Sequence, residues 1–320
     1  MKRVLLSDSI APAGEELLSR EAAIIRAPES SLDTLRRMAR DADGVITRSK
    51  LPDDLFEAAP RVRAVVVHGT GTDLVPVESA TAHAVMVANL PGVNAQSAAE
   101  YCAMAMLMLA RNIFTITNTL RSGSWDDARR LGAQARELTG MTLGIIGVGA
   151  IGGRLAKIAR NGLGMKVVGH QRRLDRLPAE CSPSSLHDLL AQSDFVVIAC
   201  PLTPQTKYLV NESTLALMKR SAWLINVGRG PVVQEEALIE ALRAKRIAGA
   251  MLDVYEHYRL EPGHALFSLD NVILTPHLAA VTQEARARAG LAAADEMLRM
   301  LRGERPRNLV NPEVMKKVVT

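Results

Sequence analysis

A glycine-rich segment at residues 142–154 has the residue types and spacing that suit the binding of a phosphate group, because three glycines follow a short apolar run as G-x-G-x-x-G. The first glycine allows a tight turn, the second lets the backbone approach a pyrophosphate, and the third lets a helix pack closely on the strand. The start of that helix directs unpaired N–H groups at the phosphates. A second strand pattern at residues 166–168 completes the context that predicts a dinucleotide site. The predicted cofactor-binding residues are Gly147, Gly149, Ala150, Ile151 and Gly152.

The residues after this second strand indicate which nicotinamide cofactor binds. NAD sites usually place an acidic residue here, which accepts a hydrogen bond from the ribose 2′-hydroxyl group. This sequence has Gln171 at that place, followed by Arg172 and Arg173. No carboxylate repels a 2′-phosphate, and the two guanidinium groups can bind it. The sequence therefore predicts NADP(H) as the preferred cofactor, with NAD(H) as the second choice.

Two further side chains are suited to the chemistry of organic acids. Arg229 follows the strand predicted at residues 223–227, and His277 follows the strand predicted at residues 272–274. Open α/β sheets bind their ligands at the carboxyl ends of the strands. The planar guanidinium group suits two parallel hydrogen bonds to a carboxylate, and an imidazole can carry a proton near neutral pH. These residue types could hold an acid and exchange a proton, although a lone arginine or histidine at a strand end can equally be structural.

Strand and helix patterns alternate along the 320 residues, which predicts two α/β domains with parallel sheets covered on both faces. Ser31 is the expected N-cap of a helix at residues 31–40. One long helix is expected at residues 95–117, and residues 118–140 are expected to form an arm at a subunit interface. The strands of the first domain are predicted at residues 3–7, 22–26, 44–47, 63–67 and 85–88, and those of the second at 143–146, 166–168, 195–199, 223–227, 249–252 and 272–274.

The composition excludes several classes of protein. The content of hydrophobic residues is 48%, but only 3% of residues are aromatic, so the cores must be aliphatic. The net charge of +5 is spread along the chain without a dense basic tract, which argues against nucleic-acid binding and suits an anionic substrate. Cys102, Cys181 and Cys200 match no metal-ligand spacing and suggest no disulfide framework, so no metal site and a cytoplasmic location are expected. The longest apolar stretch, residues 98–110, is too short to span a membrane.

Eight segments in order resemble the D-isomer-specific 2-hydroxyacid dehydrogenase family, in particular its glyoxylate/hydroxypyruvate reductases. They are Val45-Ile-Thr-Arg-Ser49, His68-Gly-Thr-Gly-Thr-Asp73, Asn94-Ala-Gln-Ser-Ala-Ala-Glu100, the glycine segment, Cys200-Pro-Leu-Thr-Pro-Gln-Thr206, Ile225-Asn-Val-Gly-Arg-Gly230, Ala250-Met-Leu-Asp-Val254 and Leu274-Thr-Pro-His277. The resemblance implies two doubly wound parallel-sheet domains. A flavodoxin-like substrate domain would comprise residues 1–95 and 287–320, and a Rossmann dinucleotide-binding domain would comprise residues 96–286. It also implies an active site in the cleft between the domains, and a homodimer.

The resemblance also implies roles for single residues. Arg229 would hold the substrate carboxylate and polarise the adjacent carbonyl group, and His277 would protonate the carbonyl oxygen as hydride arrives. Asp253 would lie near the nicotinamide carboxamide. The other implied contacts are Pro201, Leu202, Thr206, Val227 and Gly228 for the cofactor, and Ser49, Thr70 and Gly71 for the substrate.

The sequence departs from the family pattern after Asp253, where members usually carry a glutamate that pairs with the catalytic histidine. Tyr258 takes the place of that glutamate, while Glu261 lies three positions later. Either the Tyr258 hydroxyl group orients His277, which we favour, or the loop is rebuilt and Glu261 reaches in. A phenol favours the imidazolium form less than a carboxylate does, so reduction should fall off at a lower pH than in a glutamate-bearing relative.

The expected activity is the NAD(P)-dependent reduction of a small 2-keto acid, such as glyoxylate or hydroxypyruvate, to the D-2-hydroxy acid. The alternative is a cofactor-binding regulatory protein with weak or no turnover, like the corepressor members of the family. The altered residue at Tyr258 gives that alternative its weight, whereas Arg229 and His277 favour the enzyme. Formate oxidation is not expected, because formate lacks a 2-oxo group.

Overall fold

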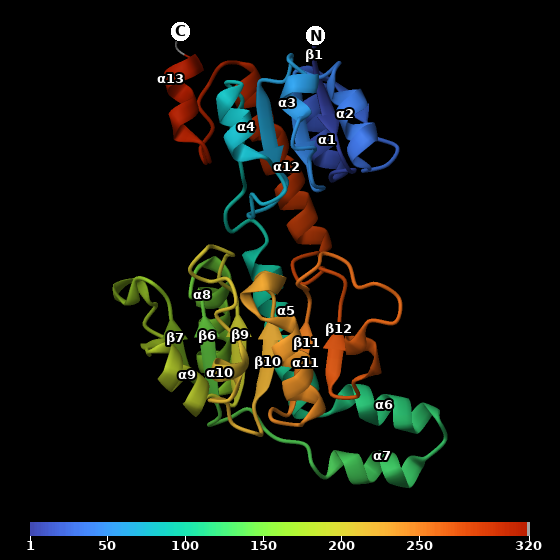
Figure 1. Cartoon of the computed structure of the whole chain (residues 1–320), viewed down its shortest axis with the longest axis vertical. Coiled ribbons are helices and arrows are strands. Elements are labelled where there is room, and N and C mark those ends of the chain that lie inside the picture. The colour runs from blue at the N-terminus through green and yellow to red at the C-terminus, as the bar shows by residue number, and fades with distance from the viewer. Residues whose placement is uncertain (319–320) are drawn as a thin grey trace. The chain divides into compact units, whose positions relative to one another are not determined.

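The computed structural model describes residues 1–318, and their contacts divide the chain into two compact units (Figure 1). Residues 319 and 320, the end of the predicted substrate domain, lie outside the described residues. The contacts assign residues 281–286 to unit 1, whereas the sequence division placed them in the other domain. The units are Met1–Asn94 with Val281–Thr320 (unit 1) and Ala95–Ala280 (unit 2).

Unit 1 is built on a five-stranded parallel sheet in the order β2-β1-β3-β4-β5, as in flavodoxin-like folds. Alternate residues of each strand face opposite sides of the sheet, so Val4 and Leu6 enter one apolar core while Leu5 enters the other. Ser31 caps α2 as predicted, because its side chain accepts a hydrogen bond from the Thr34 N–H group. The strands are β1 (Lys2–Leu6), β2 (Ala22–Arg26), β3 (Gly44–Thr47), β4 (Ala64–Val67) and β5 (Met86–Ala88). The helices are α1 (Pro12–Ser19), α2 (Leu32–Ala39), α3 (Leu55–Ala58), α4 (Val77–Ala82), α12 (Gln283–Leu301) and α13 (Met315–Val318).

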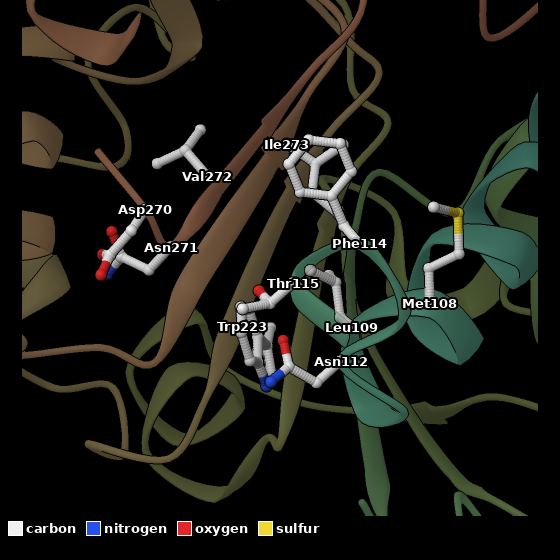
Figure 2. A pocket seen from close by; sticks show the side chains of 10 residues that line it. All are labelled: Met108, Leu109, Asn112, Phe114, Thr115, Trp223, Asp270, Asn271, Val272 and Ile273. Carbon is white, nitrogen blue, oxygen red and sulfur yellow. The ribbon is translucent and has the colours of Figure 1, made fainter. Parts of the chain in front are cut away.

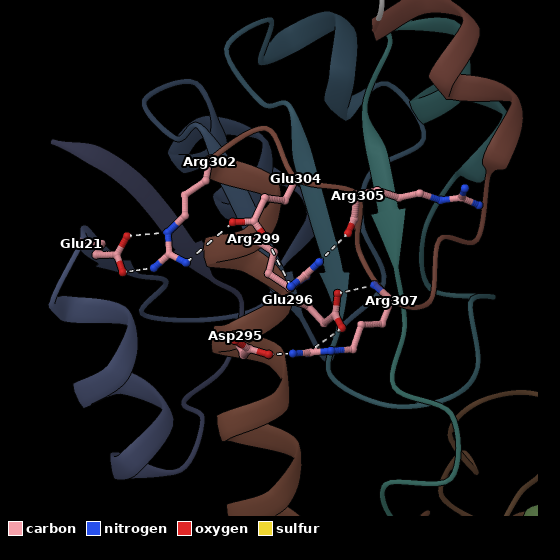
Figure 3. Close-up of polar contacts among 8 residues, drawn as sticks. All are labelled: Glu21, Asp295, Glu296, Arg299, Arg302, Glu304, Arg305 and Arg307. Carbon is pink, nitrogen blue, oxygen red and sulfur yellow. Dashed lines mark hydrogen bonds and ion pairs between the residues drawn. The ribbon is translucent and has the colours of Figure 1, made fainter.

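The C-terminal part of unit 1 is tied to the sheet by polar contacts around α12 (Figure 3). The buried Glu296 carboxylate accepts hydrogen bonds from the Arg307 N–H group at 2.9 Å and from Arg307 Nη1 at 3.2 Å. Arg302 pairs with Glu21 near the end of α1. The chain then reaches the sheet edge, where Leu309 forms an antiparallel bridge with Ala88. The last segment therefore belongs structurally with the first ninety-odd residues.

Unit 2 is built on a seven-stranded parallel sheet in the order β12-β11-β10-β9-β6-β7-β8. This is the order of dinucleotide-binding folds with one further strand at the β12 edge, and the strand order reverses at β6. The two predicted parallel-sheet α/β domains are thus confirmed, although β8 was not predicted. The strands are β6 (Thr142–Ile146), β7 (Lys166–His170), β8 (Ser182–Pro183), β9 (Phe195–Ile198), β10 (Trp223–Asn226), β11 (Gly249–Leu252) and β12 (Val272–Leu274). The helices on this sheet include α8 (Ala150–Lys157), α9 (Leu186–Gln192), α10 (Glu212–Leu215) and α11 (Glu235–Arg243).

The prediction of one long helix at residues 95–117 is wrong. Asn112 has a left-handed backbone with φ of 50°, which ends α5 (Ala95–Ala110) and starts α6 (Ile113–Arg121) in a new direction. Residues 118–140, predicted as an arm, begin within α6 and contain α7 (Trp125–Gly132), and these two helices form a hairpin that is visible in Figure 1. None of the side chains of α6 is buried.

Within residues 1–318, no helix has the length and apolarity needed to cross a membrane. The same part of the chain contains no cluster of three or more potential metal ligands. The three cysteines are buried free thiols.

Candidate active site

The glycine loop after β6 has the geometry that its spacing predicts. Gly147 has φ of 93°, and a Cβ atom there would lie 2.5 Å from the Cys200 nitrogen. A Cβ atom on Gly152 would lie 2.5 Å from the Gly147 carbonyl oxygen, so this glycine permits close packing of α8. A Cβ atom on Gly149 would meet nothing within 4 Å. The first and third glycines therefore serve the fold, whereas the second leaves an open approach to the start of α8, where a phosphate fits.

Three loops meet at the point where the strand order reverses. The loop after β9 contains Cys200, whose backbone packs against Gly147. The loop after β10 packs on the other side, since a Cβ atom on Gly228 would lie 2.7 Å from the Cys200 oxygen. Thr206 closes the β9 loop by donating a hydrogen bond to the Pro201 carbonyl at 2.7 Å. The structure thus brings together the predicted cofactor residues that follow β6, β9 and β10, at the edge where doubly wound sheets bind nucleotides.

The turn after β7 carries no carboxylate at the position that usually contacts the ribose. The Gly147 N–H group donates to the His170 carbonyl at 2.8 Å, which fixes this turn beside the glycine loop. The neutral amide of Gln171 donates to the Arg173 carbonyl at 2.8 Å. Arg173 also pairs with Asp175 at 3.1 Å in an exposed contact, and Arg172 is exposed. The charge next to Gln171 is therefore mainly positive.

Arg229 is held at the carboxyl end of β10 by a buried amide. Asn226, which is 1% exposed, accepts a hydrogen bond from the Gly228 N–H group at 3.1 Å and donates to the Arg229 carbonyl at 3.2 Å. Arg229 Nη1 donates to the Gly228 carbonyl at 2.9 Å. The sequence motif contained Asn226 but gave it no role. Its role is to fix the backbone that presents the guanidinium group.

Asp253 holds the turn that carries His277. Its carboxylate is 1% exposed and accepts three hydrogen bonds, from Thr275 Oγ1 at 2.7 Å and from the N–H groups of Leu278 and Ala279 at 2.8 Å each. Its backbone carbonyl accepts from the His277 N–H group at 2.9 Å. His277 itself has φ of 55°, a left-handed conformation that costs a residue with a Cβ atom free energy and is often found at functional sites. Asp253 was expected to lie beside the cofactor. The structure shows that it also supports the turn that carries His277.

Two tyrosines reinforce the same turn. The Tyr255 hydroxyl donates to the carbonyls of Thr275 at 2.8 Å and Leu252 at 3.1 Å. Burial raises the pKa of Tyr255 to about 12, so the phenol remains a donor at neutral pH. Tyr101 from α5 shares a hydrogen bond of 2.5 Å with Thr275 Oγ1. Sequence reasoning missed both tyrosines, although Tyr255 follows the β11 motif directly.

The Tyr258 ring lies against His277 in this structure. The Tyr258 and His277 rings lie 6.0 Å apart between centroids, with an angle of 71° between their planes. This is an edge-to-face contact of the rings. The side chain of Glu261 is exposed, and its carbonyl accepts from the His264 N–H group. The contact that the structure shows is one between the rings, and the roles of the Tyr258 hydroxyl group and of Glu261 stay predictions.

The predicted substrate residues of unit 1 follow β3 and β4. Ser49 Oγ donates to Asp8 Oδ2 at 2.8 Å, and Asp8 also accepts from Ser7 at 2.7 Å. Thr70 lies three residues after the end of β4, beside Gly71, and its Oγ1 atom donates to the Leu90 carbonyl at 3.3 Å. Carboxyl ends of neighbouring parallel strands share one sheet edge, so these side chains belong to one polar edge.

His68 is a buried histidine on this polar edge that sequence reasoning did not select. Burial, followed by the charge of Arg48, lowers the pKa of His68 to about 4, so its imidazole is neutral at neutral pH. Its Nε2 atom is buried and has no hydrogen-bond partner among the described residues. The sequence feature that could have identified His68 is its position directly after β4, at a strand end where ligands often bind.

A separate pocket lies at the opposite ends of the strands in unit 2 (Figure 2). Trp223 and Val272, the first residues of β10 and β12, line it together with Asn112 and Phe114. None of the predicted catalytic or cofactor-binding residues is among its lining residues. The carboxyl edge of the sheet therefore remains the candidate active site.

Comparisons with known proteins agree with this arrangement. Residues 103–279 match the model of the D-isomer specific 2-hydroxyacid dehydrogenase NAD binding domain. The chain is 39% identical to a glyoxylate reductase of Aeropyrum pernix, with 98% of this chain and 97% of the relative covered. It is 37% identical to a glyoxylate reductase of Thermococcus kodakarensis, with the same coverage of 98% and 97%. The structure of an NADPH-dependent glyoxylate/hydroxypyruvate reductase from Sinorhizobium meliloti, with NADP and malonate, superposes with a TM-score of 0.84 at 29% identity, covering 98% of this chain and 97% of that one.

Proposed function

The chain belongs to the D-isomer-specific 2-hydroxyacid dehydrogenase family and is an NAD(P)-dependent reductase of 2-keto acids, and we propose that its substrate is glyoxylate or hydroxypyruvate and its preferred cofactor NADPH. The observation that carries the proposal is the carboxyl edge of the unit 2 sheet. An open glycine loop, Arg229 and the supported turn of His277 all follow strands that end there. The corepressor-like alternative gives no reason for a buried carboxylate to hold the His277 turn.

The residues of this chain divide the proposed reaction among them. NADPH, when bound, supplies the hydride. Arg229 binds the substrate carboxylate through its guanidinium fork and draws electron density from the adjacent carbonyl group. His277 donates a proton to the carbonyl oxygen as the alcohol forms, and takes a proton back in the oxidative direction. Ser49, Thr70 and Gly71 are the proposed substrate contacts of unit 1.

The substrate class is tested by following NADPH absorbance with glyoxylate, hydroxypyruvate, phenylpyruvate and a dicarboxylic 2-keto acid. We expect the two small acids to give the highest kcat/KM. Absence of NADPH consumption with all four acids, in a protein that binds NADPH, would favour the regulatory alternative. A clear preference for phenylpyruvate would reject the proposed substrate while leaving the reaction class intact.

The preference for NADPH is inferred from Gln171 and the two arginines that follow it. Replacing Arg172 with alanine should raise the KM for NADPH about tenfold, the usual scale of one charge-assisted contact, and leave the KM for NADH unchanged. Gln171→Asp should shift the preference towards NADH, because a carboxylate repels the 2′-phosphate. Comparable kcat/KM values of the wild-type protein for NADH and NADPH would overturn the inference.

We also infer a homodimer that pairs through the helices at the start of unit 2. Leu107, Ile113, Phe114 and Trp125 on α5, α6 and α7 are between 44% and 64% exposed, an unusual density of large apolar side chains on a surface. Light scattering should give twice the mass of the chain, and Trp125→Glu combined with Phe114→Asp should give a monomer. A wild-type monomer at micromolar concentration would contradict the inference.

A further inference from the structure

Tyr258 lies in the segment between β11 and the turn at residues 265–268, and its side chain is exposed to solvent. Tyr258 is 69% exposed, although its ring lies against His277. A side chain so exposed depends on its backbone for position, because few neighbours restrict its rotamers. Residues 256–264 are called the 256–264 segment below. The contacts that fix its two ends therefore determine where the Tyr258 ring lies.

One carboxylate contacts both ends of the 256–264 segment. Glu235, the first residue of α11, accepts a hydrogen bond from the Glu256 N–H group through Oε2 at 3.1 Å. Its other oxygen, Oε1, lies 3.2 Å from Nε2 of His264. His264 Nδ1 accepts from the Leu266 N–H group at 3.3 Å, so the proton of the neutral ring is on Nε2 and points at Glu235. The two side chains are only 12% and 23% exposed, which limits competition from water.

The contact at residue 256 is reciprocal. Glu256 Oε2 accepts from the Glu235 N–H group at 3.2 Å, and Glu256 Oε1 accepts from the Tyr208 hydroxyl. Gln234, the N-cap residue of α11, makes no side-chain cap bond, and Glu256 instead accepts from a backbone N–H group at this helix start. The segment is thus bound to the helix at one end by paired backbone and carboxylate contacts.

The start of the segment also packs directly against the residue after Arg229. A Cβ atom on Gly230 would lie 1.7 Å from the Tyr255 carbonyl oxygen and 2.5 Å from the Glu256 nitrogen. Only glycine permits this approach of the two backbones. The position of the 256–264 segment is therefore coupled to the strand end that presents Arg229 as well as to His277.

We propose that Glu235 is a positioning residue of the active site, which fixes both ends of the 256–264 segment and thereby holds the Tyr258 ring against His277. The proposal rests on the proposed function, because it assigns the consequence to proton transfer by His277. It predicts that weakening the Glu235 contacts lowers kcat without changing the affinity for the nucleotide.

Glu235→Gln is the primary variant, because an amide keeps the size but offers one acceptor oxygen where the segment presents two donors. We expect kcat with hydroxypyruvate to fall about tenfold, a typical result of misplacing a catalytic group, while the Kd for NADPH stays within twofold. Glu236→Gln is the matched control, since Glu236 is exposed on the same turn of α11 and should have wild-type kcat. Equal kcat values for the two variants would overturn the proposal.

A second readout does not require turnover. Arg259 lies within the segment and is exposed, so trypsin can report how firmly the segment is held. Cleavage after Arg259 should be several-fold faster in Glu235→Gln than in the wild type and in Glu236→Gln. If the wild-type protein reduced no keto acid, the proposed function would fail while this comparison still tested the positioning. Equal cleavage rates in all three proteins would overturn the proposal independently.

The His264 contact provides a rescue experiment. Gln can place an amide N–H group near the position of His264 Nε2, whereas Leu cannot donate, so His264→Gln should retain kcat and His264→Leu should lose it. In a Tyr258→Ala background, Glu235→Gln should have no additional effect on kcat, because the ring it positions is absent. An undiminished tenfold effect in that background would show that Glu235 acts by another route, which would overturn the proposal.

Discussion

Two loops at the same edge of the unit 2 sheet are built in opposite ways. The glycine loop after β6 is fixed by backbone geometry, with Gly147 at positive φ and Gly152 within contact distance of the strand end. The region that follows β11 and β12 is fixed by side chains, since the Asp253 carboxylate holds the His277 turn and Glu235 contacts both ends of the 256–264 segment. The glycine loop leaves space for a ligand, whereas the second region positions the side chains of His277 and Tyr258.

This difference indicates which substitutions each loop cannot tolerate. A loop that depends on backbone geometry fails when a Cβ atom is added at the wrong glycine, because backbone cannot move aside cheaply. A loop that depends on buried side chains fails when an acceptor is lost, because donors are then left unsatisfied. Substitutions in the two loops should therefore separate into effects on nucleotide binding and effects on proton transfer.

The largest effect is expected at Gly147. Gly147→Ala combines an unfavourable φ with a contact of 2.5 Å to backbone, and should lower the free energy of unfolding by about 4 kcal/mol. Gly149→Ala is the control: its Cβ atom meets nothing within 4 Å, so stability should change by less than about 1 kcal/mol while the affinity for NADPH falls. Denaturant unfolding and nucleotide titration measure the two quantities. Equal loss of stability in both variants would contradict the separate roles of the glycines.

The next largest effect is expected at Asp253. Asp253→Asn places an NH₂ group against at least one of the donors Thr275, Leu278 and Ala279, and should cost about 3 kcal/mol of stability. The loss should be accompanied by a large drop in kcat, because the His277 turn loses its support. Thr275→Val, which removes one hydroxyl of the same network, should cost about 1 kcal/mol. If Asp253→Asn kept wild-type kcat, the supporting role of this carboxylate would be wrong.

The smallest effect is expected at the residue beside His277. Tyr258→Phe keeps the ring contact and should change kcat less than about threefold, the scale of one exposed polar contact. Tyr258→Glu should extend reduction to higher pH by about one unit, because a nearby carboxylate favours the imidazolium form that donates the proton. The pH dependence of kcat/KM measures this shift. Unchanged activity of Tyr258→Phe together with a strong loss in Glu261→Gln would instead identify Glu261 as the partner.

Sequence reasoning reached the glycine loop and both parallel sheets because their signals are local. Glycine spacing and apolar runs act within a few residues of the feature that they predict. The break at Asn112 was missed, since the apolar pattern continues through it and only a left-handed backbone ends the helix. The choice between Tyr258 and Glu261 stays open, because the path of this segment involves contacts between residues far apart in sequence, such as that of Glu256 with Glu235. Asp8 and His68 were also missed, because a single polar residue at a strand end carries no spacing signal.

The central claim is that His277 donates the proton in reduction of a small 2-keto acid by NADPH. The most direct test compares kcat/KM for hydroxypyruvate in the wild-type protein and in His277→Gln, with the NADPH affinity measured in parallel. The account predicts a loss of about 10²–10⁴-fold in kcat/KM with the nucleotide affinity retained. A His277→Gln protein that reduced hydroxypyruvate within a few-fold of the wild-type rate would contradict it.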